Sequence, residues 1–111
     1  MKNLLREQAP STSMRFAKAV ADQTRQRILQ LCACQWLSVT ELVEQLGLAQ
    51  PTVSHHLAIL KEAGLVEEQR EGRQVFCRLN QTHMAQGCGQ LLQAIALDAA
   101  MPPTTDDDEN A

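Results

Sequence analysis

The sequence predicts a mainly α-helical fold with a β-hairpin wing, the arrangement called a winged helix-turn-helix. Two segments with helical spacing of apolar residues, 38–47 and 50–64, are joined by the stretch GLAQ, which contains the short glycine-containing turn of a helix-turn-helix. Directly after them, over residues 65–79, the hydrophobic period changes from helical to alternating, as in two paired strands. A hairpin in this place makes the helix-turn-helix a winged one.

The length of 111 residues fits one domain with looser segments at both ends. We expect a flexible N-terminal segment over residues 1–13, one folded domain over 14–101 and an acidic disordered tail over 102–111. The tail begins with two prolines and contains the run DDDEN. No run of about 18 apolar residues is present, and the first residues do not form a secretory signal. We therefore expect a cytoplasmic protein that does not contact membranes.

Two helices are predicted ahead of the helix-turn-helix. The first spans 14–22, MRFAKAVAD, and the second spans 22–36, DQTRQRILQLCACQW. Asp22 is a residue type preferred immediately before a helix, and Ile28 and Cys32 share one face at a spacing of four. Cys32 is therefore expected to face the core.

Residues with defined roles at helix ends bound the two helices of the helix-turn-helix. These are Ser38 with Glu41 as a capping box, Gly47 at the end of the first helix, Pro51 in the first turn of the second, and Gly64 at its end.

A last helix is predicted over 83–100, after a hairpin whose tip lies near Glu71 and Gly72. Two glycines, Gly87 and Gly89, weaken this helix locally and allow another backbone to approach closely. Its apolar residues are expected to form a single stripe made of Met84, Cys88, Leu91 and Ile95.

The helix over 50–64 carries a surface suited to DNA. If each residue advances the direction by about 100° from the inward Val53, the outward face holds Thr52, His55, Ala58, Ile59 and Glu62. The first turns of a recognition helix enter the major groove, where hydroxyls and amides reach bases or phosphates. Arginines at a hairpin tip serve a wing on phosphates or in the minor groove. The predicted DNA contacts are Gln50, Thr52, Ser54, His55, Lys61, Arg70 and Arg73, whereas His56 is expected to pack or hydrogen-bond inside the protein.

Three strings of the sequence resemble the ArsR/SmtB family of bacterial repressors. They are ADQTRQRIL, LSVTELVEQLGLAQPTVSHHLAILKEAGLV and REGRQVFCRL, and the resemblance covers roughly residues 14–99. It implies a homodimeric winged-helix repressor that needs no cofactor to bind operator DNA. Such repressors release the DNA when they bind a metal or metalloid ion or when their thiols are modified. We expect the two subunits to pair through their first and last helices.

The inducer sites known in the family are not matched by this chain. A Cys-x-Cys pair is replaced by Ser38 and Thr40, and a zinc-type site on the last helix would need ligands where Ala94 and Leu97 stand. The cadmium/lead-type positions late in the recognition helix hold Ile59 and Ala63. Any sensor must therefore use other residues.

Four cysteines remain as candidates: Cys32, Cys34, Cys77 and Cys88. Three thiolates suit a soft ion, and the resemblance points to Cys32, Cys34 and Cys88 as a site for As(III) or another soft metal ion. Two residues along a helix differ in direction by about 200°, so Cys34 joins Cys32 only if the helix frays. A redox or persulfide switch with the same thiols, and purely structural cysteines, are the alternatives. Cys77 is expected to belong to the core.

Other classes of function fit the sequence less well. No glycine-rich phosphate loop or catalytic triad is present, so we do not expect an enzyme. A winged helix that binds proteins instead of DNA agrees with the net charge of −3. However, four of the thirteen acidic residues lie in the tail, and without them ten basic residues face nine acidic ones. DNA binding must then depend on local basic patches.

Overall fold

The computed structural model describes residues 11–99 of the chain, with side chains described up to residue 96. The predicted acidic tail over 102–111 and most of the predicted flexible segment over 1–13 lie outside the described residues. The first described helix, α2 (Thr12–Val20), begins two residues earlier than predicted because the Ser11 side chain accepts a hydrogen bond from the Met14 N–H at 3.1 Å.

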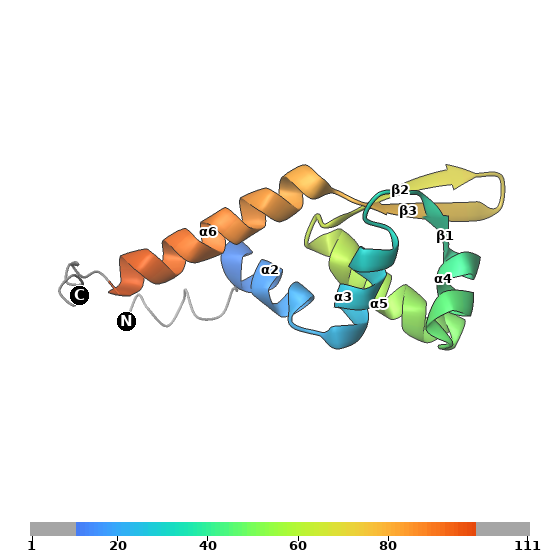
Figure 1. The fold of residues 1–111 in the computed structure, drawn as a ribbon, viewed down its shortest axis with the longest axis horizontal. Coiled ribbons are helices and arrows are strands. Elements are labelled where there is room, and N and C mark those ends of the chain that lie inside the picture. Colours follow the sequence, from blue (N-terminus) through green and yellow to red (C-terminus); the bar gives the residue numbers. More distant parts are fainter. Residues whose placement is uncertain (1–10, 100–111) are drawn as a thin grey trace.

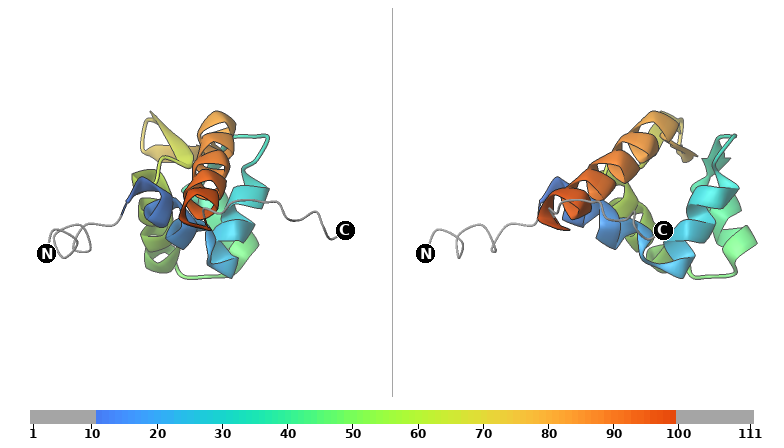
Figure 2. Two further views of the ribbon diagram at one scale, coloured as in Figure 1. Left: turned by 90° about the vertical axis from the view of Figure 1, so that its left-hand side faces the viewer. Right: turned by 60° about the vertical axis from the view of Figure 1, so that its left-hand side comes forward.

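Five helices and three short strands make up the described part of the chain (Figure 1). The long C-terminal helix lies along α2, while the other helices and the hairpin form the opposite end of the molecule (Figures 1 and 2). None of the described helices is long and apolar enough to cross a membrane. The remaining helices are α3 (Gln23–Leu31), α4 (Val39–Leu46), α5 (Gln50–Glu62) and α6 (Gln81–Ala99).

The helix-turn-helix has the predicted end residues in the predicted roles. Ser38 and Glu41 form a reciprocal capping box at the start of α4, with hydrogen bonds of 3.0 and 2.8 Å. Gly47 follows α4 with φ 68°, in the left-handed region that glycine adopts at low cost. Pro51 stands in the first turn of α5, where its missing N–H has no helical partner to lose.

Helix α3 is shorter than the prediction of 22–36. It ends at Leu31, and Cys32 leaves helical geometry with φ −105° and ψ 23°. The carbonyl of Cys32 instead accepts the N–H of Leu79 at 2.9 Å, and the carbonyl of Ala33 accepts the Gln81 side-chain amide at 2.9 Å. The end of α3 is therefore fastened to the junction between the last strand and α6.

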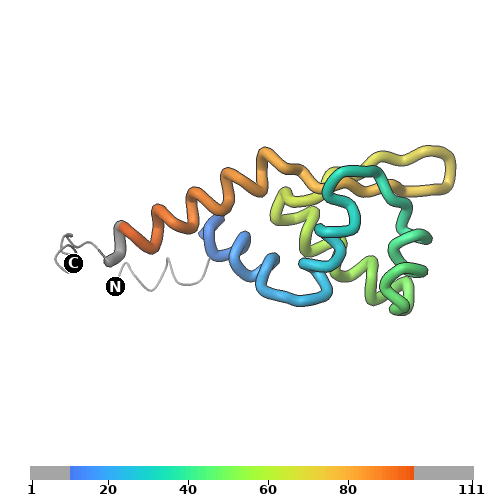
Figure 3. The backbone as a smooth tube through the Cα atoms, viewed as in Figure 1, coloured from blue at the N-terminus to red at the C-terminus, as the bar shows by residue number. Residues whose placement is uncertain are grey.

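The wing is a hairpin of β2 (Val66–Glu71) and β3 (Gln74–Leu79), as predicted, joined by a two-residue turn at Gly72. A third strand, β1 (Leu37–Ser38), was not predicted and pairs antiparallel with β3, giving the order β1-β3-β2. This strand lies in the connection that leads from α3 into α4, which can be followed in the backbone trace (Figure 3).

The core lies between the helices and the inner side of the sheet. Its fully buried side chains include two cysteines, Cys32 and Cys77, which confirms the prediction that Cys77 is a core residue. The other large ones are Ile28, Leu42, Val53, Leu60 and Leu65.

Two of the four residues in the predicted apolar stripe of α6 do not face the core of the single chain. Met84 and Leu91 pack against the core, but the buried residue between them is Gly87 and not Cys88. Gly87 faces the ring of Phe16 in α2, which leaves no room for a larger residue. Cys88 and Ile95 are consequently exposed in the single chain.

Candidate nucleic-acid interface

The N-terminal end of α5 is presented to solvent. Gln50, Thr52, Ser54 and His55 are all exposed there. Ala49, which precedes the helix, has no side-chain oxygen, so no side chain caps the first N–H groups of α5. Free N–H groups and the positive end of the helix dipole favour a negatively charged partner at this position.

A polar groove separates α5 from the hairpin. Its cavity volume is about 370 Å³, and it is bounded by the start of α4, one side of α5 and both strands of the wing. Five of the seven predicted DNA-contacting residues line it: Gln50, Ser54, Lys61, Arg70 and Arg73. The other two, Thr52 and His55, are exposed on α5 but do not line this groove.

The charges in this groove are unequal. Lys61, Arg70 and Arg73 contribute three positive charges, and Glu68 contributes one negative charge. Glu68 is paired, since its Oε1 lies 2.9 Å from the Lys61 Nζ. The groove thus forms a locally basic strip in a protein whose net charge is −3.

His56 faces the interior of the protein, as predicted. Its Nδ1 lies 3.1 Å from the Arg25 guanidinium and 3.8 Å from the Asp22 carboxylate. The hydrogen bond from the Arg25 backbone N–H holds the pKa of Asp22 below its usual value, and the charges of Arg25 and His56 lower it further. Arg25 also donates to the carbonyls of Ala19 and Lys18 at 2.7 and 3.1 Å, so one side chain ties α2, α3 and α5 together.

The prediction that Ile59 faces outward is wrong. Ile59 is partly buried and packs against the core, although Ala58 beside it is exposed and lines the groove. Both α2 and α3 contact α5, so α5 buries a wider arc than the stripe of Val53, Leu57 and Leu60 alone.

The four cysteines occupy two kinds of environment. Cys32 and Cys77 are fully buried, and Cys34 and Cys88 are exposed. Burial raises the pKa of Cys32, and it raises the pKa of Cys77 to about 12. Both buried thiols are therefore protonated at neutral pH, whereas a soft metal ion binds thiolates.

Cys34 lies beside the last strand and the first turn of α6. It lines a second cavity of about 460 Å³ with Glu67 and Arg78. The Arg78 guanidinium lies 4.5 Å from the centre of the Trp36 ring and 3.3 Å from the Glu67 carboxylate. This cavity is on the side of the wing away from the groove against α5, because it is lined by Glu67 and the groove by Glu68, and successive side chains of a strand point to opposite faces of the sheet.

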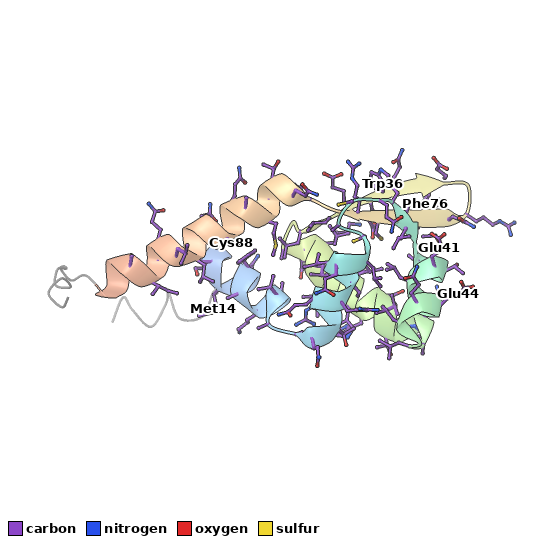
Figure 4. All side chains as sticks on the ribbon, in the orientation of Figure 1. Met14, Trp36, Glu41, Glu44, Phe76 and Cys88 are labelled. Carbon is purple, nitrogen blue, oxygen red and sulfur yellow. The ribbon has the colours of Figure 1, made fainter. Side chains whose placement is uncertain are left out.

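Cys88 is distant from this cavity along α6. It lies seven positions after Gln81, which corresponds to about 10 Å of helix. Figure 4 shows Cys88 midway along α6 and Trp36 beside the wing. Among the side chains that the structure describes in one chain, no three from His, Cys, Asp or Glu gather into a group that could hold a metal ion. The site predicted at Cys32, Cys34 and Cys88 is therefore not assembled within one chain, and it remains a prediction.

The groove also contains residues that were not predicted as DNA contacts, among them Thr40, Glu68 and Gln74. Thr40 belongs to α4 and Gln74 to β3, and only the folded chain brings them beside α5. The pairing of Glu68 with Lys61 crosses the turn at Gly64, so no helical or strand spacing indicates it.

The helix pair α4–α5, the polar end of α5 and the wing beside it define a winged helix-turn-helix protein. Residues 22–68 match the model of the arsR family of bacterial regulatory proteins. The HTH-type transcriptional regulator CmtR of Mycobacterium bovis is 38% identical over 97 residues, which cover 86% of this chain and 82% of CmtR. The chain therefore belongs to the ArsR family.

Two further similarities agree with this assignment. The arsenic resistance transcriptional regulator ArsR1 of Pseudomonas putida is 45% identical over 64 residues, covering 57% of this chain and 50% of ArsR1. The structure of HlyU from Vibrio cholerae superimposes with a TM-score of 0.62 at 34% identity, covering 76% of this chain and 90% of HlyU.

Proposed function

We propose that this protein is a cytoplasmic, homodimeric repressor that binds a specific operator sequence and has no catalytic activity. The observation that carries the proposal is the exposed polar end of α5 beside a groove lined by Lys61, Arg70 and Arg73. Side chains at the start of α5 would read base edges, and the basic groove would hold the backbone. The names of CmtR and ArsR1 as transcriptional regulators support the same function.

The exposed face of α6 supports pairing with a second copy. Leu92 and Ile95 are 69% and 59% exposed, and Met14 of α2 is 49% exposed. Large apolar side chains at such exposure gain free energy when another apolar surface covers them. A two-fold axis beside α2 and α6 would place the two copies of α5 about one turn of DNA apart.

For the inducer, we propose a thiophilic agent, with As(III), Sb(III) or another soft metal ion as the first candidates. Cys34 and Cys88 are exposed, and Cys32 would have to leave the core and lose its proton to join them. A second chain or a rearrangement of residues 32–34 is needed to complete such a site. The name of ArsR1 as an arsenic resistance regulator favours As(III) among the candidates.

The hydrogen bonds at the end of α3 provide a way for an inducer to act on DNA binding. The carbonyls of Cys32 and Ala33 accept hydrogen bonds from the Leu79 N–H and the Gln81 side-chain amide. Leu79 and Gln81 flank the junction between the wing and α6. An ion that draws Cys32 outward would break these bonds and change the angle between the wing and the dimer helices. Coupling of this kind typically amounts to about 1–3 kcal/mol.

A redox or persulfide response is the second candidate for the inducer. The exposure of Cys34 favours it, because an exposed thiol reacts with electrophiles and sulfur donors without unfolding of the protein.

One experiment tests the DNA-binding function and the inducer together. The protein is bound to a labelled duplex of the DNA upstream of its own coding sequence. The complex is then titrated with As(III), Sb(III), Cd(II), Zn(II) and a persulfide donor. We expect release by As(III) or Sb(III), and no release from the Cys34→Ser or Cys88→Ser variants. Release by the persulfide donor alone would favour the second candidate, and a wild type that does not bind the duplex would contradict the proposed function.

A further inference from the structure

The groove between α5 and the wing holds one cation in an internal ion pair. Lys61 extends from the last turn of α5, and its Nζ lies 2.9 Å from Oε1 of Glu68 in β2. Glu68 is paired in register with Cys77 of β3, so it stands within the sheet and not at the hairpin tip. The two side chains are 58% and 30% exposed, and both line the groove.

The other two cationic side chains of the groove are not paired with a carboxylate of the described residues. No ion pair within the described residues involves Arg70 or Arg73. Exposed ion pairs contribute little to folding stability, because water already solvates both charges well. The carboxylate of Glu68 should therefore affect the binding of a charged ligand in the groove more than it affects the stability of the fold.

We propose that a DNA phosphate takes the place of Glu68 as the partner of Lys61, and that Glu68 thereby limits how strongly and how salt-dependently the protein binds DNA. The inference rests on the proposed function, since it assumes that the groove receives the DNA backbone. Lys61 exchanges its hydrogen-bonded ion pair with Glu68 for one with a phosphate, and no covalent bond is made or broken. Glu68 is left facing a phosphate and regains a cation from solution.

The exchange has a defined effect on salt dependence. A free lysine that neutralises one phosphate releases a condensed counterion and makes the slope of log K against log salt more negative by about 0.9. When the lysine must first leave a carboxylate, the cation that the carboxylate takes up offsets this release. Lys61 in the wild type should then add almost nothing to the slope, and Lys61 beside a neutral residue 68 should add the full increment.

The neighbouring residue Glu67 is a matched control. It lies in the same strand and also forms an ion pair, with Arg78 at 3.3 Å. That pair lines the second cavity, with Cys34 and the start of α6, and not the groove against α5. Glu67→Gln and Glu68→Gln change the net charge of the protein equally, so only the position of the charge differs between them.

The test measures the affinity of the full chain by fluorescence anisotropy between about 50 and 200 mM salt. The probes are a labelled duplex of the upstream DNA and one of shuffled sequence. We expect Glu68→Gln to bind several-fold more tightly at the lowest salt, with a slope steeper by about 0.9. Glu67→Gln should keep the wild-type slope, and the change caused by Glu68→Gln should disappear in a Lys61→Gln background.

Three results would overturn the proposal: an unchanged slope in Glu68→Gln, an equal change in Glu67→Gln, or a change that persists without Lys61. In each of them the wild type still binds DNA, so the proposed function would stand. A wild type that binds neither duplex would overturn both.

Discussion

The ring of Phe16 occupies the space that a β-carbon at Gly87 would fill, so α2 and α6 meet at a glycine. Gly87→Ala should therefore push the two helices apart and destabilise the fold by about 1–3 kcal/mol, as overpacking does elsewhere. Gly89, in the same helix, has nothing within 4 Å of its β-position. Gly89→Ala should stabilise by up to about 1 kcal/mol through helix propensity. Urea denaturation of both variants checks the contrast, and equal effects would contradict this packing.

Asp22 should make the stability of the protein depend on acid. Its pKa is lowered in the fold, mainly by the hydrogen bond from the Arg25 N–H, so the charged carboxylate stabilises the native state. The contribution is present above the unfolded pKa of about 3.9 and is lost as the pH falls through the lower folded value.

The variant Asp22→Asn keeps a residue that caps α3 but removes the titration. At neutral pH the melting temperature of the wild type should be higher than that of this variant, and the difference should shrink below about pH 4. A constant difference over that range would mean that the Asp22 charge does not contribute.

The cysteines should divide into two reactive and two protected thiols. Cys32 and Cys77 are buried with raised pKa values, so they should resist iodoacetamide at neutral pH until the protein unfolds. Cys34 is exposed and should react in the native state. Peptide mass spectrometry with and without denaturant checks the division, and native labelling of Cys32 as fast as that of Cys34 would contradict it.

Cys88 should report on the proposed dimer. It is exposed in one chain but shares α6 with Leu92 and Ile95, which we propose are covered by the partner. Its labelling should slow as protein concentration rises, and that of Cys34 should not. Leu92→Glu, at a side chain that is 69% exposed, should leave the fold intact and yield a monomer in analytical ultracentrifugation. A Leu92→Glu variant that remains dimeric would place the interface elsewhere.

Local signals in the sequence predicted the helix-turn-helix well. The contacts at the two ends of helix α4 are local, made by Ser38 and Glu41 at its start and by Gly47 after its last turn. Each of the three residues has the predicted role in the structure. The two-residue strand β1 was missed because it exists only through its pairing with β3, about forty residues away. The spacing of residues within one segment cannot indicate a pairing with such a distant strand.

The errors at α5 and α6 have a similar origin. Helical periodicity gives the direction of each side chain but not the width of the arc that neighbouring helices cover. Ile59 packs against the core and is partly buried, and α5 is contacted by both α2 and α3. On α6 the contact with Phe16 selects Gly87 as the inward residue and leaves Cys88 outside. The same shift separates the predicted thiol ligands Cys32 and Cys88, one buried and one exposed.

The claim on which the other proposals depend is that α5 reads a specific DNA sequence. The most direct test compares the affinities for the upstream duplex and for a shuffled duplex of the same composition, at one salt concentration. We predict that the upstream duplex binds at least about 10³-fold more tightly, the lower end of the range for specific regulators. Equal affinities for the two duplexes would contradict the account.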